Sequence, residues 1–506
     1  MSGNLYHLLE SGFPSDGSEI AIQRPDGSEV SYAELERLSA CMAQLLEDSG
    51  VEKGSRVLVQ VEKSAHGVAL YLACLRAGAV YLPLNTGYTV SELEYFVADA
   101  TPTVIVCDPS RADAVQAIAA EQGAARLFTL DADGKGTIAE AAAAFDGRHA
   151  CVEAAPDDLA AILYTSGTTG RPKGAMLSHG NLSSNALSLH QLWGFVPGDV
   201  VLHALPIFHV HGLFVALHCA LLNGSRMLFL PRFDSDVVIR LLPQATVMMG
   251  VPTFYTRLLA HSDFSRDVCR RVRLFISGSA PLLEETFQSF AARCGHHILE
   301  RYGMTEAGMI ASNPLYGQRI PATVGYPLPG VYARVVDESG NLLPNGEVGG
   351  LEIKGPNVFK GYWGKPDKTK EDFRSDGFFM TGDLARIDKR RRISIVGRSK
   401  DMIISGGYNV YPKEVEEQID AIDGVGESAV VGVPHRDFGE GVIAVVTRDA
   451  SRLNLDAAAL IDNLADSLAR FKQPKRIFFV DDLPRNAMGK VQKNVLRKQY
   501  ESCFGE

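Results

Sequence analysis

The order in which apolar segments follow one another is the strongest constraint on the fold of this chain. Short apolar runs of strand length occur at residues 56–60, 103–107 and 159–164, whereas residues 32–46 repeat their apolar side chains at helical spacing. Similar segments alternate through most of the chain. Because alternating strands and helices pack as helices against a mostly parallel sheet, the pattern predicts an α/β fold.

The length and a change in sequence texture predict more than one domain. At 506 residues the chain exceeds the size at which one hydrophobic core keeps growing, so at least two domains are expected. From about Ala333, short runs such as residues 350–354 alternate with glycine-containing turns, which indicates a more antiparallel β region. A basic, glycine-punctuated stretch at residues 388–401 then precedes a second, smaller α/β pattern. We therefore expect a hinge near Lys400.

Composition narrows the class of protein. The net charge of -10 and the isoelectric point near 5.8 argue against a nucleic-acid binder, which needs a basic face. The sequence has no apolar run of about 18 residues that could span a bilayer. Its cysteines form no CxxC pair, which argues against a zinc site or a disulfide framework. The first residues resemble neither a signal peptide nor a transit peptide, so we expect a cytoplasmic protein without nucleic-acid or membrane partners.

A loop rich in glycine and hydroxyl side chains, Thr-Ser-Gly-Thr-Thr-Gly-Arg-Pro-Lys-Gly, covers residues 165–174. Glycines allow backbone N–H groups to approach phosphate oxygens, hydroxyls donate further hydrogen bonds, and a lysine adds a point charge. The predicted phosphate contacts are Thr165, Ser166, Gly167, Thr168, Thr169, Gly170 and Lys173. The loop lacks the spacing of a Walker A motif, and a plain surface loop is the alternative.

Five motifs in a fixed order resemble the signature of the adenylate-forming superfamily, which includes acyl-CoA synthetases, luciferases and adenylation domains of peptide synthetases. They are the loop at 165–174 and the segments 301–306, 381–383, 397–401 and 484–490. The resemblance implies a large N-terminal adenylation domain, residues 1–398, of two α/β sheet subdomains plus a small β subdomain. A small mobile α/β C-terminal domain, residues 399–506, would follow. The implied enzyme joins a carboxylic acid to AMP and passes the acyl group to a thiol, with Mg²⁺ as cofactor and ATP and coenzyme A as co-substrates.

Two of these motifs would hold the nucleotide and its metal ion. The resemblance puts the ring of Tyr302, next to Gly303, against adenine. It puts the Thr305 hydroxyl on the α-phosphate and the Glu306 carboxylate on Mg²⁺. Asp383 would accept both ribose hydroxyls, and Arg398 would donate to the ribose or a phosphate. Two other interpretations stay open: a helix N-terminus at residues 304–306 and a plain turn at residues 381–383.

The C-terminal segment would supply a mobile cation and the thiol site. By resemblance, Lys490 contacts the incoming carboxylate and the α-phosphate and neutralises charge while the acyl-adenylate forms. The C-terminal domain would then rotate about Lys400, and Ser405, Gly406 and Gly407 would meet the arm of coenzyme A. A solvated lysine and an ordinary tight turn are the alternatives. Lys490 also lies in a Pro-x4-Gly-Lys pattern that resembles an acetylation site of related bacterial synthetases, so a lysine acetyltransferase is a candidate partner.

Polar residues in the candidate pocket segments indicate the class of acid. The predicted substrate contacts are His209, Arg257, Ser277, Gly278, Ser279 and Arg301. A charge-assisted contact from an arginine suits a second carboxylate, which favours a short dicarboxylic acid. We expect Arg257 to make this contact, with Arg301 as the second choice and a helix-surface arginine as the alternative for Arg257. His209 and His211 do not make a zinc site without further ligands.

Across these segments the chain resembles the malonate and methylmalonate branch of the superfamily, the malonyl-CoA synthetases. Residues 307–309 read Ala-Gly-Met, which is closer to general acyl-CoA ligases. The expected reaction converts malonate or methylmalonate, ATP and coenzyme A into the CoA thioester, AMP and diphosphate. A short-chain, medium-chain or aryl acyl-CoA ligase is one alternative. An enzyme that loads a carrier protein is another, although the chain ends soon after Lys490, which favours free coenzyme A.

Overall fold

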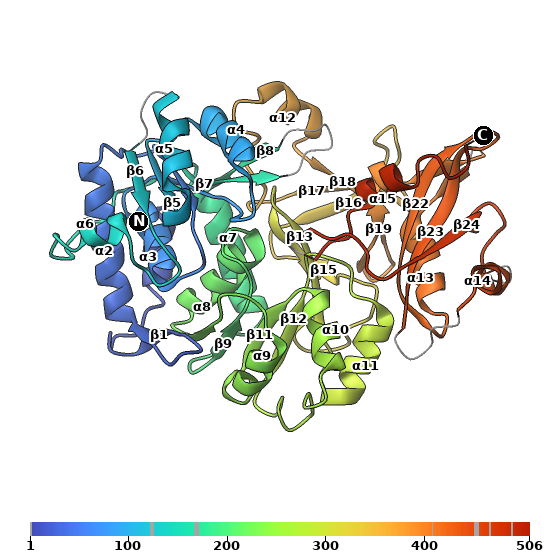
Figure 1. Cartoon of the computed structure of the whole chain (residues 1–506), viewed down its shortest axis with the longest axis horizontal. Coiled ribbons are helices and arrows are strands. Elements are labelled where there is room, and N and C mark those ends of the chain that lie inside the picture. Colours follow the sequence, from blue (N-terminus) through green and yellow to red (C-terminus); the bar gives the residue numbers. More distant parts are fainter. Residues whose placement is uncertain are drawn as a thin grey trace.

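The structure, a computed structural model, describes residues 3–121, 126–165, 172–406, 408–449, 455–464, 467–486 and 489–505. Within these residues the strands form four sheets, and the last part of the chain is set apart on the right of Figure 1. The α/β pattern predicted from the apolar runs is confirmed.

The first sheet has six strands in the order β6-β5-β3-β4-β7-β8. Its strands are β3 (Arg56–Gln60), β4 (Val80–Pro83), β5 (Val104–Cys107), β6 (Arg126–Thr129), β7 (Leu159–Thr165) and β8 (Lys173–Ser178). Its helices are α2 (Tyr32–Asp48), α3 (Ala65–Arg76), α4 (Val90–Ala100), the short η1 (Pro109–Arg111), α5 (Ala112–Glu121) and α6 (Thr137–Ala142). All pairs are parallel except β7 with β8. Helix α4 begins at a capping box in which Thr89 and Glu92 satisfy each other's backbone N–H groups.

The second sheet has nine strands in the order β15-β14-β13-β12-β11-β9-β10-β1-β2. Its strands are β1 (Ile20–Gln23), β2 (Glu29–Ser31), β9 (Val200–His203), β10 (Arg226–Phe229), β11 (Val247–Gly250), β12 (Leu274–Ser277), β13 (Leu299–Met304), β14 (Gly308–Ser312) and β15 (Tyr326–Pro327). The helices around it are α1 (Leu5–Glu10), α7 (His179–Leu192), the π-helix η2 (His211–Leu217), α8 (His218–Leu222), α9 (Ser235–Leu241), η3 (Leu242–Gln244), α10 (Pro252–Ala260) and α11 (Glu284–Cys294). Strands β9, β11 and β12 are parallel neighbours, so the segments that follow them meet at one edge.

The third sheet is antiparallel, as the texture beyond Ala333 predicts. It contains β16 (Tyr332–Val336), β17 (Gly349–Lys354), β18 (Phe379–Ile387) and β19 (Ile393–Arg398), with α12 (Pro366–Asp372) beside it. Buried residues of this sheet belong to the same hydrophobic cluster as residues of the first two sheets. The three sheets therefore share one core.

The last part of the chain builds a fourth sheet on a core of its own. The short helix η4 (Ser399–Asp401) leads into it, and its strands are β20 (Ile403–Ser405), β21 (Tyr408–Val410), β22 (Val425–His435), β23 (Gly439–Arg448) and β24 (Arg476–Val480). Its helices are α13 (Pro412–Asp420), α14 (Ala457–Leu464) and α15 (Lys493–Gln499). Lys400 lies exposed in η4, and the domain boundary and hinge expected there stay predictions.

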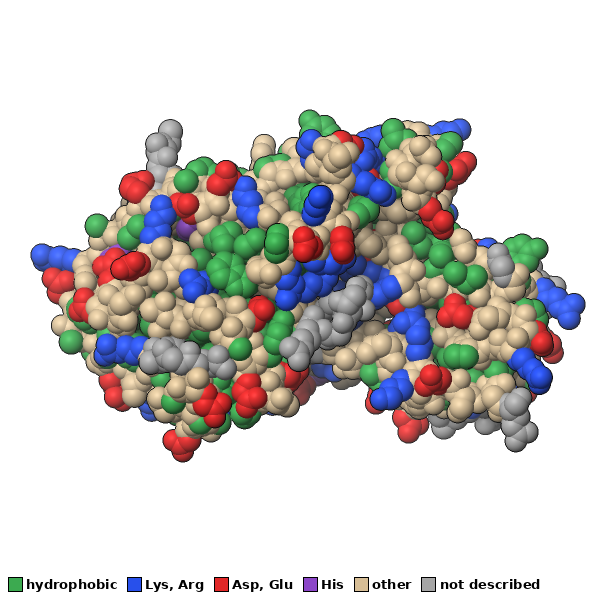
Figure 2. Space-filling view, turned by 90° about the horizontal axis from the view of Figure 1, so that it is seen from above, with side chains coloured by type: hydrophobic (Ala, Val, Ile, Leu, Met, Phe, Trp, Pro, Cys, Tyr) green, Lys and Arg blue, Asp and Glu red, His purple; other side chains and the backbone are tan. Residues whose placement is uncertain are grey.

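Helix length and the distribution of surface charge are two further features of the described residues. Among the described residues, none of the helices combines the length and the apolar character that a membrane crossing requires. Basic side chains gather near the middle of the face seen in Figure 2, although the chain as a whole is acidic. A local basic region of this kind is suited to anionic ligands.

Candidate active site

The glycine-rich loop is the connection of the antiparallel pair β7 and β8. Thr165 and Lys173 are Cα partners at the end of this pair, so they flank the loop. The Lys173 side chain is buried and its amine lies 4.6 Å from the ring centre of Tyr362. The predicted contacts Ser166, Gly167, Thr168, Thr169 and Gly170 lie outside the described residues. Strand pairing thus fixes both flanks of the predicted phosphate loop.

Tyr302, Asp383 and Arg398 meet where β13 approaches the third sheet. The Tyr302 hydroxyl donates to one oxygen of the Asp383 carboxylate, and Arg398 Nε lies 2.9 Å from the other. Asp383 and Arg398 are also Cα partners on β18 and β19. Burial raises the pKa of Asp383, and the Arg398 guanidinium opposes this rise. The three side chains predicted to hold adenosine therefore form one connected group.

The interpretation of residues 381–383 as a plain turn is wrong. Thr381, Gly382 and Asp383 lie inside β18, where Gly382 adopts φ of 70°. Glycine adopts this left-handed conformation without strain, so β18 can include Gly382 without ending in a turn there. Cross-strand pairing sets the structure here instead of local turn chemistry.

The segment that carries Glu306 is a tight connection between β13 and β14. Met304 pairs with Gly308 across it, so the interpretation of residues 304–306 as a helix N-terminus is wrong. A Cβ on Gly303 would lie 2.3 Å from the Gly308 carbonyl oxygen, which explains the glycine. Thr305 lies half-buried in this connection.

The Glu306 carboxylate fits a metal ion that is held mainly by phosphates. Glu306 is buried, burial raises its pKa, and the Tyr362 hydroxyl lies 3.3 Å from its Oε1. The described residues contain no cluster of three or more His, Cys, Asp or Glu that could hold a metal by themselves. Mg²⁺ is usually bound through one or two carboxylates plus phosphate oxygens, so a single buried glutamate is compatible with it.

Lys490 lies among these side chains, which we call the nucleotide site (Tyr302, Glu306, Asp383, Arg398 and Lys490). The surrounding protein, and then the Arg398 guanidinium, lower the pKa of Lys490 to about 8, whereas the Asp383 carboxylate raises it. The side chain keeps access to solvent. Its loop packs on α10, since a Cβ on Gly489 would lie 3.1 Å from Thr253 Oγ1. The structure thus brings the predicted catalytic lysine to the predicted nucleotide residues.

This pKa predicts how the formation of the adenylate depends on pH. An ordinary lysine stays charged until about pH 10, but an amine with a pKa of about 8 loses its charge as the pH rises through that value. We expect kcat/KM for diphosphate release, which reports the free enzyme, to fall as the pH rises through about 8. A pH profile of this rate that stays flat to about pH 10 would contradict the assignment.

Arg301 lies against the segment after β12, and its charge also acts on Lys490. A Cβ on Gly278 would lie 2.4 Å from the guanidinium carbon of Arg301, so only glycine allows this approach. Arg301 is buried, and burial lowers its pKa to about 9. Its Nε and Nη2 atoms, Ser277 Oγ and His211 Nε2 are buried and have no hydrogen-bond partner among the described residues. Several unpaired polar groups in one place fit an anionic ligand.

Two histidines and a strained serine complete this second group, which we call the acid pocket (His209, His211, Ser277, Gly278, Ser279 and Arg301). Ser279 adopts φ of 72° and its Oγ lies 3.2 Å from His211 Nδ1. A positive φ in a non-glycine residue is often found at functional sites. Burial, and then the Lys490 amine, lower the pKa of His209 to about 3, so His209 is a neutral ring between the two groups. The structure therefore brings these polar side chains together in one group, and their role in binding the acid stays a prediction.

Arg257, the residue we expected to bind a second carboxylate, is not part of this group. It lies exposed in the last turn of α10 and makes no described contact with the acid pocket. The structure therefore reverses the order expected from the sequence: Arg301 is buried with unpaired nitrogens, whereas Arg257 has the exposure of a helix-surface arginine.

The predicted contacts for coenzyme A lie on the hairpin of β20 and β21. Ser405 is buried, and Gly406 adopts φ of 60° and donates its N–H to the Phe438 carbonyl oxygen at 2.8 Å. Gly407 lies outside the described residues. These residues belong to the C-terminal unit, and their predicted role stays a prediction.

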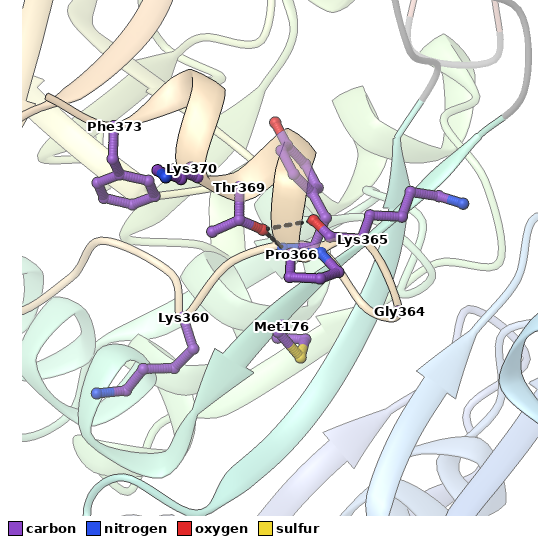
Figure 3. A pocket seen from close by; sticks show the side chains of 9 residues that line it. Met176, Lys360, Gly364, Lys365, Pro366, Thr369, Lys370 and Phe373 are labelled. Carbon is purple, nitrogen blue, oxygen red and sulfur yellow. Dashed lines mark hydrogen bonds between the residues drawn. The ribbon is translucent and has the colours of Figure 1, made fainter.

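A hollow of about 450 Å³ lies beside the nucleotide site and was not predicted. Met176 and segment 360–373 line it, with Lys360, Lys365 and Lys370 around it (Figure 3). Its wall includes Tyr362, which contacts both Lys173 and Glu306. Sequence reasoning missed Tyr362 as a site residue. Its place in a segment resembling the superfamily, residues 355–362, was the only signal.

Comparison with known proteins gives consistent matches over the whole chain. The AMP-binding enzyme family matches residues 14–363, and the AMP-binding enzyme C-terminal domain matches residues 414–490. Malonate–CoA ligase of Arabidopsis thaliana is 34% identical over 99% of this chain and 90% of its own length. Feruloyl-CoA synthase of a Streptomyces species is 36% identical over 94% of this chain and 95% of its own length.

Two solved structures of one protein bear on the arrangement of the site. MatB from Rhodopseudomonas palustris with ATP bound is 54% identical, covers 100% of both chains and superposes with a TM-score of 0.97. The same protein without ligand, also 54% identical over 100% of both chains, gives 0.87. The present arrangement, with Lys490 in the nucleotide site, thus resembles the ATP-bound form more than the ligand-free form.

Proposed function

The chain belongs to the AMP-binding enzyme family, and from this membership we propose that it joins a short dicarboxylic acid, malonate or methylmalonate, to coenzyme A. The acid first attacks the α-phosphorus of ATP, which releases diphosphate and leaves an acyl-adenylate. The thiol of coenzyme A then attacks the acyl carbon, which releases AMP and leaves the thioester. The similarity to malonate–CoA ligase of Arabidopsis thaliana supports malonate as the acid.

The single observation that carries the choice of acid is the Arg301 guanidinium. It is buried, and two of its nitrogens have no described hydrogen-bond partner. A buried arginine that stays unpaired is costly, and a carboxylate that accepts from both nitrogens offsets this cost. Ser277 and His211 add polar groups to the same pocket. A monocarboxylic acid of equal size would leave these groups unpaired.

The nucleotide site supplies the charges that the first step requires. A carboxylate and a triphosphate repel one another, so cations must lie where they meet. Lys490 reaches the site from the C-terminal unit, and Lys173 borders the phosphate loop. Bound Mg²⁺, held by Glu306 and the phosphates, would offset further negative charge on the phosphate oxygens. Thr305 would donate to the α-phosphate, while Asp383 and Arg398 hold the ribose.

The second step requires a different position of the C-terminal unit. The hairpin that carries Ser405 and Gly406 lies in the same C-terminal unit as Lys490, and this unit has a hydrophobic core of its own. We assign residues 399–506 as a domain that turns about Lys400 and brings this hairpin to the acyl-adenylate. Acetylation of Lys490 by a lysine acetyltransferase would remove the charge used in the first step. This modification and the cytoplasmic location stay predictions.

An aryl acyl-CoA ligase is the second candidate function, because the feruloyl-CoA synthase matches with a similar identity. An aromatic acid needs a pocket lined mainly by apolar side chains. The acid pocket instead holds a buried arginine, two histidines and two serines. These polar groups favour the dicarboxylic acid.

The test of the function measures diphosphate release with malonate, methylmalonate, acetate and ferulate in the presence of ATP and Mg²⁺. We expect release with malonate or methylmalonate at a kcat/KM at least about 100-fold above that with acetate, because loss of one charged hydrogen-bond pair costs a few kcal/mol. Addition of coenzyme A should yield the thioester, detected by mass. A higher kcat/KM with ferulate would support the second candidate, and no release with any acid would overturn both.

A further inference from the structure

A buried lysine without a role in the proposed chemistry lies behind the acid pocket. Lys63 precedes α3, is 8% exposed, and its amine lies 2.9 Å from His203 Nδ1 and 2.8 Å from the His203 carbonyl oxygen. The Phe229 ring centre lies 4.1 Å from the same amine. Burial lowers the pKa of this amine. Both polar partners of Lys63 thus come from one residue at the end of β9.

His203 links this lysine to the π-helix. Its Nε2 lies 2.9 Å from the Gly212 carbonyl oxygen, which can only accept, so Nε2 carries the proton. Burial lowers the pKa of His203, so the ring is neutral and Nδ1 accepts from the Lys63 amine. The protonation state of the ring is therefore determined by its two neighbours. Substitution of Lys63 would leave a buried ring nitrogen without its donor.

The π-helix carries the link into the acid pocket. Gly212 lies in its first turn, next to His211, whose Nδ1 lies 3.2 Å from Ser279 Oγ. A Cβ on Gly212 would lie 2.0 Å from the Pro206 carbonyl oxygen, so this turn is closely packed. π-Helices are rare and are often found at functional sites. A continuous chain of contacts thus runs from Lys63 through His203 and Gly212 to Ser279.

We propose that Lys63 is a positioning residue of the acid pocket: by holding His203 against Gly212, it keeps the His211 ring in place against Ser279. This inference rests on the proposed function, because it assigns the pocket to the acid. Lys63 lies beside the first sheet and His203 ends a strand of the second, so the contact also fixes the two sheets relative to each other behind the pocket. If the contact were purely structural, Lys63→Met would lower stability but would not raise the KM for malonate more than the KM for ATP.

The experiment compares Michaelis constants in full-length Lys63→Met. We expect the KM for malonate to rise about tenfold, because the loss of one buried hydrogen bond has an effect of this order. The KM for ATP should change less than about twofold, because the contacts of Lys63 among the described residues are with His203 and Phe229, outside the nucleotide site. Equal changes in both constants, or an unchanged KM for malonate, would overturn the proposal.

Matched variants separate positioning from stability. Tyr71→Phe removes another buried contact, that of the Tyr71 hydroxyl with His218 Nε2 at 2.8 Å, which lies beyond the other end of the π-helix. It should leave the KM for malonate unchanged. Lys63→Gln keeps an N–H donor group on a shorter side chain and should give an intermediate KM if Lys63→Met fails to fold.

A double-mutant cycle tests the route of the effect. If Lys63 acts through His211 and Ser279, Lys63→Met combined with Ser279→Ala should raise the KM for malonate no further than the worse single variant. Additive effects would place Lys63 outside this route and overturn the proposal. Failure of the proposed function is distinguishable, because the unaltered protein would then release no diphosphate with malonate.

Discussion

Lys490→Ala should lower the rate of acyl-adenylate formation by about 10³-fold, which is the upper range for removal of one preorganised group that stabilises developing charge. Lys490 is the cation that the C-terminal unit places beside Asp383 and Arg398. Without it, the acid carboxylate approaches the triphosphate with one fewer opposing charge. The measurement is ATP–diphosphate exchange with malonate.

Formation of the thioester from the adenylate, the second half-reaction, should be nearly unaffected by Lys490→Ala, and this difference makes the prediction specific. Malonyl-adenylate prepared in advance should form the thioester with coenzyme A at nearly the normal rate in Lys490→Ala, because that step needs no further charge on the α-phosphate. Lys498→Ala, which alters an exposed lysine of α15, serves as the control and should affect neither half-reaction. Equal losses in both half-reactions would mean that Lys490 acts on folding or on domain packing.

Local patterns in the sequence predicted the elements of the fold well. The apolar run at residues 56–60 coincides with β3, and the helical repeat at 32–46 lies within α2. These patterns depend on burial of neighbouring side chains, which a single sequence reveals. At residues 381–383 the alternative of a plain turn is wrong, because the glycine has turn chemistry but Asp383 pairs with a strand that follows later in the chain. Pairing between distant segments is not visible in local chemistry.

The composition of the acid pocket could be predicted, but not which arginine enters it. Arg257 and Arg301 have the same side chain, and both follow apolar segments. Their difference arises from geometry: Gly278 leaves space for the Arg301 guanidinium, and α10 turns Arg257 toward solvent. Successive side chains of a strand point to opposite faces, so Arg301 serves the acid pocket and Tyr302 the nucleotide site. Lys63 and His203 gave no sequence signal, because only folding brings them together.

Arg301→Met should lower kcat/KM for malonate by about 10³-fold, because the substitution removes the charge partner of a buried carboxylate while keeping an unbranched side chain of similar length. Acetate has no second carboxylate, so its kcat/KM should stay within about threefold of the normal value. The preference for malonate over acetate would then disappear. Arg301→Lys keeps the charge but loses the planar fork of the guanidinium, so its kcat/KM for malonate should lie between those of the unaltered protein and Arg301→Met.

Arg257→Ala is the matched control for Arg301→Met. Each variant removes one arginine from the N-terminal part of the chain, but only Arg301 belongs to the acid pocket. If Arg301 binds the second carboxylate, Arg257→Ala should change the malonate-to-acetate ratio of kcat/KM by less than about threefold, as expected for an exposed side chain. The opposite outcome, with preference lost in Arg257→Ala and kept in Arg301→Met, would return the assignment to the residue first expected from the sequence. The unpaired nitrogens of Arg301 would then need another partner, because a buried guanidinium without one is costly in any state of the protein.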